Sequence, residues 1–182
     1  EDCAQSFGSK IKSKMTGTFG NFGCFSFFPT KNLGTAGDGG MIITNNQSYY
    51  NKALKLRNHG SLERNIHNYL GYNSRLDEIQ AAILNIKMKY ITIFNKKRNM
   101  IANYYKKNIK NNRIITQKIV KDNYNVYHQY TIRVKNRKKF TNYLQEHNIP
   151  FGIYYPKPLY MQKAFNGIIK VKKLPNVEKI CK

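Results

Sequence analysis

The sequence is poor in acidic side chains and in long apolar runs. It holds 9 Asp and Glu residues against 32 Lys and Arg residues, and it has no Trp. No stretch approaches the roughly 18 uninterrupted apolar residues of a membrane-spanning helix. The first residues carry neither the basic start nor the apolar core of a signal peptide. These absences predict a cytoplasmic protein that has no membrane partner.

Cysteine is also scarce. The three cysteines, Cys3, Cys24 and Cys181, are an odd number and show no CxxC spacing, so neither a disulfide framework nor a zinc site is indicated. The four histidines lack metal-ligand spacing as well. We therefore expect free thiols and no bound metal.

The formal net charge of +23 is the most unusual feature of the composition. Such a charge can serve a polyanionic partner, above all nucleic acid. A binding face would concentrate the basic side chains, whereas here the lysines are scattered with Asn and Ile over the whole chain. The pattern favours a global bias of composition over nucleic-acid binding, and a basic binding module remains the alternative.

The 182 residues are enough for one good core or two small ones. Hydrophobic residues make up 41% of the chain and are spread along it, which is far too apolar for a disordered tail. The composition predicts a folded, globular chain. The start at Glu1, without an initiator Met, and the stop inside a helix-like segment predict a fragment of a longer protein.

The first half of the chain has short strands, tight loops and then helices. Glycines punctuate residues 1–45, and apolar runs predict strands at 24–28 and 41–44. A helix is expected over 48–57, closed by the left-handed conformation that Gly60 allows. Ser74 is the expected start of a long helix, whose apolar positions recur every three or four residues and which bends or breaks near 92–95.

The second half alternates strands and helices over short connections. Strands are expected at 114–120, 127–134 and 151–155, and a helix is expected over 137–146. This alternation is typical of a small α/β or α+β unit.

Lys31 is the candidate reactive residue. It follows the aromatic run Ser26-Phe27-Phe28-Pro29-Thr30 and precedes a glycine-rich loop. Apolar surroundings can desolvate an ammonium group and lower its pKa, as covalent chemistry at a lysine amine requires. From the local sequence alone, one solvated lysine among many is the commoner situation.

Several motifs together resemble the DegT/DnrJ/EryC1/StrS family of sugar aminotransferases. They follow in order along nearly the whole chain: Glu1 to Gly8, Gly23 to Gly34, Gly37-Asp38-Gly39-Gly40, Asn58-His59-Gly60, Gly71 to Ala82, Tyr127-His128-Gln129-Tyr130-Thr131, and Tyr154 to Leu159. The resemblance implies an α/β fold of the aspartate-aminotransferase-like type I class, dependent on pyridoxal 5'-phosphate. Residues 1–90 would complete the large α/β/α domain, and 91–182 would form most of the small C-terminal α/β domain.

The resemblance also implies the cofactor site. Lys31 would bind the cofactor covalently and shuttle a proton, and Asp2 would pair with the pyridine nitrogen. Gln5 would pack near the ring and Ser26 would contact the phosphate. Some relatives replace the lysine with histidine and become dehydratases, so Lys31 favours amino transfer.

Asn73 would reach the cofactor phosphate in the neighbouring subunit's site, which implies a homodimer with composite active sites. Arg75 and Tyr154 are weaker candidates for binding the substrate. As structural alternatives, Asn73 would simply precede the helix cap, Arg75 would be a solvated residue of the first turn, and Tyr154 would belong to the core. The glycines at 37, 39 and 40 lack the order of a phosphate-binding loop and are assigned to a turn.

The implied reaction moves an amino group, with glutamate as the expected donor, onto a keto carbon of a UDP- or dTDP-linked hexose used for surface glycans. The combined motifs look closest to enzymes that aminate a 3-keto carbon. A 4-keto substrate is the alternative. Full members of the family begin with a segment that is absent here and that carries part of the cofactor site.

Overall fold

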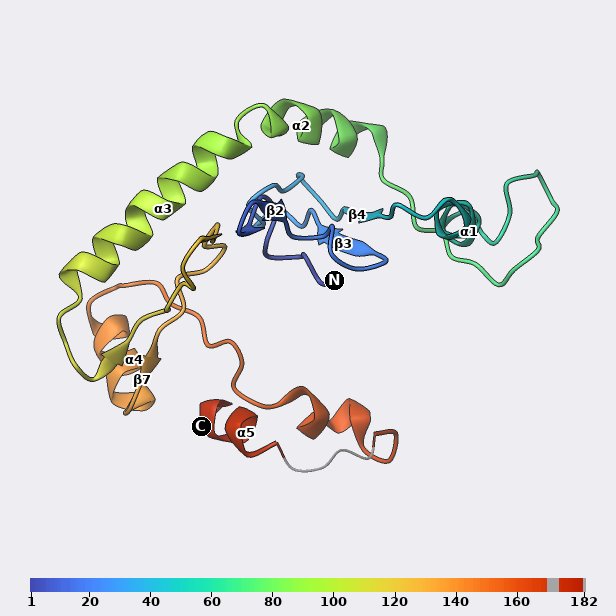
Figure 1. The fold of residues 1–182 in the computed structure, drawn as a ribbon. Helices are drawn as coiled ribbons and strands as arrows, with labels where there is room; N and C mark the ends of the chain where they lie inside the picture. Colours follow the sequence, from blue (N-terminus) through green and yellow to red (C-terminus); the bar gives the residue numbers. More distant parts are fainter. Residues whose placement is uncertain (170–173, 182) are drawn as a thin grey trace. The chain divides into compact units, whose positions relative to one another are not determined.

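The computed structural model describes residues 1–169 and 174–181, and the chain forms two compact units (Figure 1). Unit 1 comprises Glu1–Ile109 and Gln117–Tyr130, and unit 2 comprises Lys110–Thr116 and Thr131–Lys182. The predicted division of the chain at about residue 90 stays a prediction. Within each unit the helices and strands follow from local sequence signals and from pairing between distant segments.

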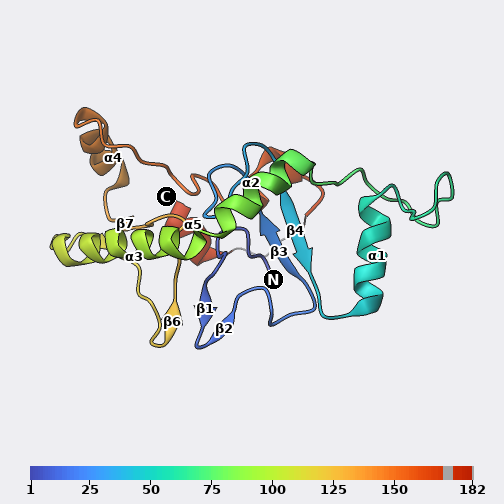
Figure 2. The same ribbon diagram turned by 90° about the horizontal axis from the view of Figure 1, so that it is seen from above.

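Two paired strands form the centre of unit 1. The strand β3 (Gly23–Ser26) pairs antiparallel with β4 (Gly40–Ile43), and the two lie side by side in Figure 2. Asp2 adds a parallel bridge to Cys24 on β3. Both strands were predicted, and each ends one or two residues earlier than its apolar run suggested. Thr44 is followed by the turn that leads into the next helix.

The apolar core of unit 1 surrounds the end of β3. Phe27, Leu33 and Leu84 are buried together, and Phe7 and Phe25 pack against them. The Phe7 and Phe25 rings meet edge to face, with centroids 5.4 Å apart. Phe27 and Leu33 therefore fix both ends of the loop that carries Lys31.

The first helix, α1 (Gln47–Arg57), confirms the predicted helix. The side chain of Asn46 accepts hydrogen bonds from the backbone N–H groups of Ser48 and Tyr49, which satisfies two free donors of the first turn. Gly60 has a φ of 81° and donates from its backbone to the carbonyl of Lys55. This is the left-handed helix end that the sequence predicted.

The next helical segment begins later and breaks earlier than predicted. It forms α2 (Glu78–Met88) and α3 (Ile91–Asn108), so Ser74 is not the cap and the break precedes residues 92–95. Ser74 donates from its backbone to the carbonyl of Arg57, which holds it in extended pairing beyond α1. The break follows from Lys89 and Tyr90, whose N–H groups bond three residues back and tighten the last turn.

A second sheet of unit 1 joins segments that are far apart in the sequence. The hairpin of β1 (Lys10–Ile11) and β2 (Lys14–Met15) pairs through β1 with β6 (Asn123–Tyr124). The strand β6 was not predicted, because its partner lies more than 100 residues away and only one polar and one aromatic residue mark it. The predicted strands at 114–120 and 127–134 are correspondingly shorter.

Unit 2 contains one small sheet and several helices. The strand β5 (Ile114–Ile115) pairs antiparallel with β7 (Arg133–Val134), and these four residues are what remains of the two longer predicted strands. The helix α4 (Arg137–Glu146) has the predicted bounds, and the Asn136 side chain caps it by accepting from the Lys139 N–H. The remaining elements are η1 (Leu159–Met161), η2 (Lys163–Phe165) and α5 (Pro175–Cys181).

The predicted strand at 151–155 is wrong. Residues 151–155 have no strand assignment, and they pair with no other segment that the structure describes. An apolar, aromatic run forms a strand only where a neighbouring backbone offers the matching donors and acceptors.

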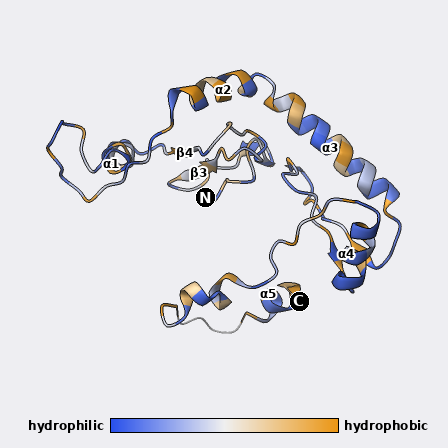
Figure 3. Cartoon of the chain, turned by 180° about the vertical axis from the view of Figure 1, so that it is seen from behind, coloured by the Kyte–Doolittle hydropathy of each residue, from blue (hydrophilic) through white to orange (hydrophobic). Residues whose placement is uncertain are grey.

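Polar and apolar residues alternate along α2 and α3, as the colouring of Figure 3 shows. Apolar side chains on these helices are widely exposed, including Ile79 at 74% and Met100 at 63%. Across residues 1–169 and 174–181, no helix is both long enough and apolar enough to cross a bilayer.

Candidate active site

Lys31 lies in a tight loop directly after β3 and is half-buried. Its backbone N–H donates to the carbonyl of Phe28 over 2.9 Å, which closes a turn through Pro29. At Gly34 an added Cβ would come within 2.6 Å of the Phe28 carbonyl oxygen, so the loop closes only around a glycine. Backbone and core together leave Lys31 little freedom of position.

The neighbour of Lys31 anchors the loop to a buried polar network. The side-chain nitrogen of Asn32 donates to Asn95 Oδ1 over 2.8 Å and to the Val126 carbonyl over 2.9 Å. Asn95, on α3, donates in turn to the Phe7 carbonyl over 3.1 Å. Asn32 and Asn95 are 7% and 3% exposed, so these bonds form in a water-poor interior, where a missing partner is costly.

The following residues on α3 hold the segment 125–128. Arg98 Nη1 donates to the carbonyls of Tyr127 and His128, both over 3.1 Å. Asn99 donates to the Asn125 carbonyl over 2.8 Å. The helix thus binds this segment through side chains, which explains why the predicted strand at 127–134 does not begin there.

His128 has an unusual environment. Burial lowers its pKa below the ordinary range, and the positive charges of Lys31 and Arg98 lower the pKa further. Its ring atom Nδ1 is buried and has no hydrogen-bond partner among the described residues. The imidazole is therefore neutral at neutral pH and lies within electrostatic reach of Lys31.

Asp2, Gln5 and Ser26 lie on or beside β3. The bridge between Asp2 and Cys24 places Asp2 two residues from the register of Ser26. The Asp2 side chain is exposed, and its Oδ1 accepts from the Ala4 N–H over 3.0 Å. Gln5 is exposed in the turn that follows, and Ser26 is half-buried, with Oγ accepting from the Phe28 N–H over 3.3 Å.

Asn73 and Arg75 form a pair in the loop before α2. The Arg75 Nε donates to Asn73 Oδ1 over 2.9 Å, and Asn73 bridges antiparallel to Asn58. Both side chains are exposed. Asn73 therefore precedes α2, whose N-cap is Asp77, by several residues.

Tyr154 belongs to unit 2 and is 57% exposed. Its ring meets that of Tyr155 edge to face, with centroids 5.6 Å apart. The core role that was the structural alternative for Tyr154 does not hold within unit 2, because the ring is largely exposed.

The sequence analysis assigned no role to four residues of the hydrogen-bond network beside the Lys31 loop: Asn32, Asn95, Arg98 and His128. The motifs that contain Asn32 and His128 supported the family resemblance, but no role was inferred for either residue. Asn95 and Arg98 lie in a lysine- and asparagine-rich helix, where nothing in the local pattern separates them from solvated neighbours. Only the tertiary contacts mark them.

The family model for DegT/DnrJ/EryC1/StrS aminotransferases matches residues 1–182. The chain belongs to this family. It is 42% identical, over its full length and 50% of the relative, to the "Pleiotropic regulatory protein" of Geobacillus stearothermophilus. It is also 42% identical, over 91% of the chain and 45% of the relative, to the UDP-N-acetyl-3-dehydro-alpha-D-glucosamine 3-aminotransferase of Acidithiobacillus ferrooxidans.

Among solved structures, S. venezuelae DesV in complex with a ketimine intermediate matches with a TM-score of 0.91 and 31% identity. This match covers 98% of the chain and 49% of DesV. The mixed α/β chain thus has part of the fold of the sugar aminotransferases. The chain spans about half the length of the relatives and structures that it matches.

The family depends on pyridoxal phosphate, and the residues of unit 1 suit that cofactor. The donor set comprises a half-buried amine at Lys31, an exposed carboxylate at Asp2 and a hydroxyl at Ser26. These groups match an aldehyde, a ring nitrogen and a phosphate. His128 Nδ1, which has no hydrogen-bond partner among residues 1–169 and 174–181, adds a buried polar atom in electrostatic reach of Lys31.

Proposed function

We propose that the chain is the part of a nucleotide-sugar aminotransferase that supplies the cofactor-binding lysine, Lys31. The observation that carries the proposal is the placement of this amine in a rigid loop between Phe27 and Leu33, directly after the strand that carries Ser26 and pairs with Asp2. Membership of the aminotransferase family supports the same reading.

In this proposal each residue has a separate task. Bound pyridoxal phosphate supplies an electron-accepting ring. Lys31 holds the cofactor covalently and takes up or releases a proton at Nζ. The Asp2 carboxylate accepts a hydrogen bond from the ring nitrogen and keeps that nitrogen protonated. The Ser26 hydroxyl donates to the phosphate, and Gln5 packs near the ring.

Asn73 is proposed to reach the phosphate in the site of a second subunit, within a homodimer. Its bond to Arg75 orients the amide by occupying Oδ1, which leaves the Nδ2 hydrogens as the donors for an anion. Arg75 is exposed and carries the charge that a substrate phosphate requires. Tyr154 is the proposed contact for the sugar.

The proposed substrate is a UDP- or dTDP-linked hexose with a keto group at carbon 3, and glutamate is the proposed amino donor. The proposed location of the reaction is the cytoplasm. The Acidithiobacillus relative is named as a 3-aminotransferase of a UDP-linked 3-dehydro sugar, which supports the proposed carbon position and nucleotide. The test offers matched 3-keto and 4-keto nucleotide sugars to protein expressed from the complete reading frame. Amine formed from the 3-keto sugar supports the proposal, and amine formed from the 4-keto sugar alone overturns the position.

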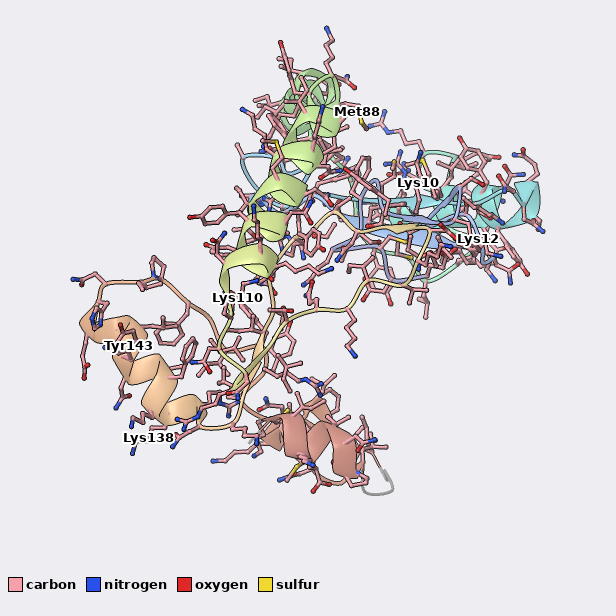
Figure 4. All side chains as sticks on the ribbon, turned by 60° about the vertical axis from the view of Figure 1, so that its left-hand side comes forward. Lys10, Lys12, Met88, Lys110, Lys138 and Tyr143 are labelled. Atoms are coloured by element: carbon pink, nitrogen blue, oxygen red, sulfur yellow. The ribbon has the colours of Figure 1, made fainter. Side chains whose placement is uncertain are left out.

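A basic binding module is the second candidate, and the net charge of +23 favours it. The regulatory name of the Geobacillus relative points the same way. Labelled lysines in Figure 4 include Lys10 and Lys12 in the β1–β2 hairpin and Lys138 on α4. Binding of duplex or single-stranded nucleic acid that weakens steeply with salt would support this candidate, and no binding at low salt would end it.

A further inference from the structure

The buried network of α3 ties the Lys31 loop to the segment that carries His128. Asn32 is bonded to the Val126 carbonyl, and Arg98 is bonded to the carbonyls of Tyr127 and His128. The loop that carries Lys31 and the segment that carries His128 are therefore linked by side-chain bonds to backbone carbonyls. These hydrogen bonds are buried or part-buried, so the link between the two segments does not depend on exposed side chains.

His128 brings an unused hydrogen-bonding atom to this place. Its Nδ1 is buried and meets no partner in residues 1–169 and 174–181. A buried polar atom without a partner carries a free-energy penalty, so native structures keep one mainly where a ligand, a water or a moving side chain uses it. The Lys31 side chain is a candidate donor, because its charge acts on the imidazole.

The charges around His128 favour its neutral form. Lys31 approaches from the loop after β3 and Arg98 from α3, and both are cations. The neighbouring phenol of Tyr127 has a raised pKa through burial and through Tyr130, so it stays neutral too. A neutral imidazole offers a lone pair, and a lysine ammonium has three hydrogens to donate.

We propose that His128 is a positioning residue for Lys31: its neutral imidazole accepts a hydrogen bond from Nζ and keeps the amine aimed at the cofactor. This inference rests on the proposed function, because it concerns the lysine that binds pyridoxal phosphate. Arg98 and Asn32 hold the imidazole in place through the backbone, and they do not contact the reacting atoms in this account.

The test is a pH titration of the visible absorbance of the pyridoxal phosphate adduct, in protein expressed from the complete reading frame. Variants H128F and H128L remove the acceptor, since neither side chain has a hydrogen-bonding atom. Because an acceptor stabilises the protonated nitrogen, both should lower the pH midpoint by about one unit. H128N, whose Oδ1 lies at about the position of the imidazole Nδ1, should keep most of the wild-type midpoint.

His147 is the matched control, since it is exposed and stacks on Tyr143 at the end of α4. H147F should leave the midpoint unchanged. Midpoints of H128F and H128L equal to that of the wild type would overturn the inference, and if one variant does not fold the other still decides. A wild type that forms no adduct on Lys31 would refute the proposed function itself, so the two failures are distinct.

Discussion

The side-chain amide of Asn32 donates to Asn95 Oδ1 across 2.8 Å, although 63 residues separate the two along the chain. This bond links the residue after Lys31 to the middle of α3. It is the central contact of the buried network, because Asn95 also reaches back to the Phe7 carbonyl. The position of the candidate lysine therefore depends on a helix that carries no catalytic group.

We predict that Asn95→Ala lowers the free energy of unfolding by about 1–3 kcal/mol, because it leaves the Phe7 carbonyl and one Asn32 hydrogen without a buried partner. Urea unfolding of wild type and variant measures the change. Asn103→Ala on the same helix is the control, since Asn103 is exposed and should change stability by less than about 0.5 kcal/mol. Equal effects of the two substitutions would show that the network contributes nothing.

Stability should depend on pH through His128. Burial, and then the Lys31 and Arg98 charges, hold the pKa of this imidazole below its ordinary value. As the pH falls below about 6.5, the unfolded chain takes up a proton that the folded chain refuses, so the free energy of unfolding falls until the folded pKa is passed. Urea unfolding at a series of pH values should show a flatter profile for H128Q. H147Q should keep the wild-type slope, and a wild-type slope in H128Q would contradict the assignment.

Asp2→Asn should reduce the aminotransferase activity by on the order of 10²-fold, because an amide no longer keeps the ring nitrogen protonated. The fold should persist, since the Asn oxygen can still accept from the Ala4 N–H. Steady-state kinetics and a melting curve measure the two effects. Asp38→Asn is the control, at an exposed aspartate in the glycine-rich turn. An active Asp2→Asn protein would remove Asp2 from the proposed site.

The composite site predicts complementation between subunits. Lys31→Ala and Asn73→Ala proteins should each be inactive, and a randomly mixed dimer population should recover about a quarter of the wild-type activity, because one site of each heterodimer has both native residues. Activity assays before and after mixing and refolding measure the recovery. If both residues serve the same subunit's site, no heterodimer has an intact site and mixing recovers nothing.

Helices with local caps could be predicted from the sequence. The bounds of α4 follow from Asn136, which caps it, and those of α1 differ from the prediction by one residue. The interrupted helix that forms α2 and α3 was predicted in outline, but it starts later and breaks earlier than predicted. The start is decided by the hydrogen bond from Ser74 to Arg57, and the break by the short-range bonds of Lys89 and Tyr90. The spacing of apolar residues contains no information on these hydrogen bonds.

Long-range contacts explain what the sequence could not predict. The strand β6 exists because β1 pairs with it from the other end of unit 1. Residues 127 and 128 were expected to begin a strand, yet a side chain of α3 satisfies their carbonyls. The order of the motifs indicated Lys31, Asp2 and Ser26. The roles considered for His128 and Asn95 follow from burial and hydrogen bonds, which no short motif encodes.

The most direct test of the account is a chemical one. Protein expressed from the complete reading frame is incubated with pyridoxal phosphate, reduced with borohydride and digested, and the peptides are mapped by mass spectrometry. We predict one reduced adduct, on Lys31, and its absence in Lys31→Ala protein that still folds. A folded wild-type dimer with no adduct, or with the adduct on another lysine, would contradict the central claim and would favour the basic binding module.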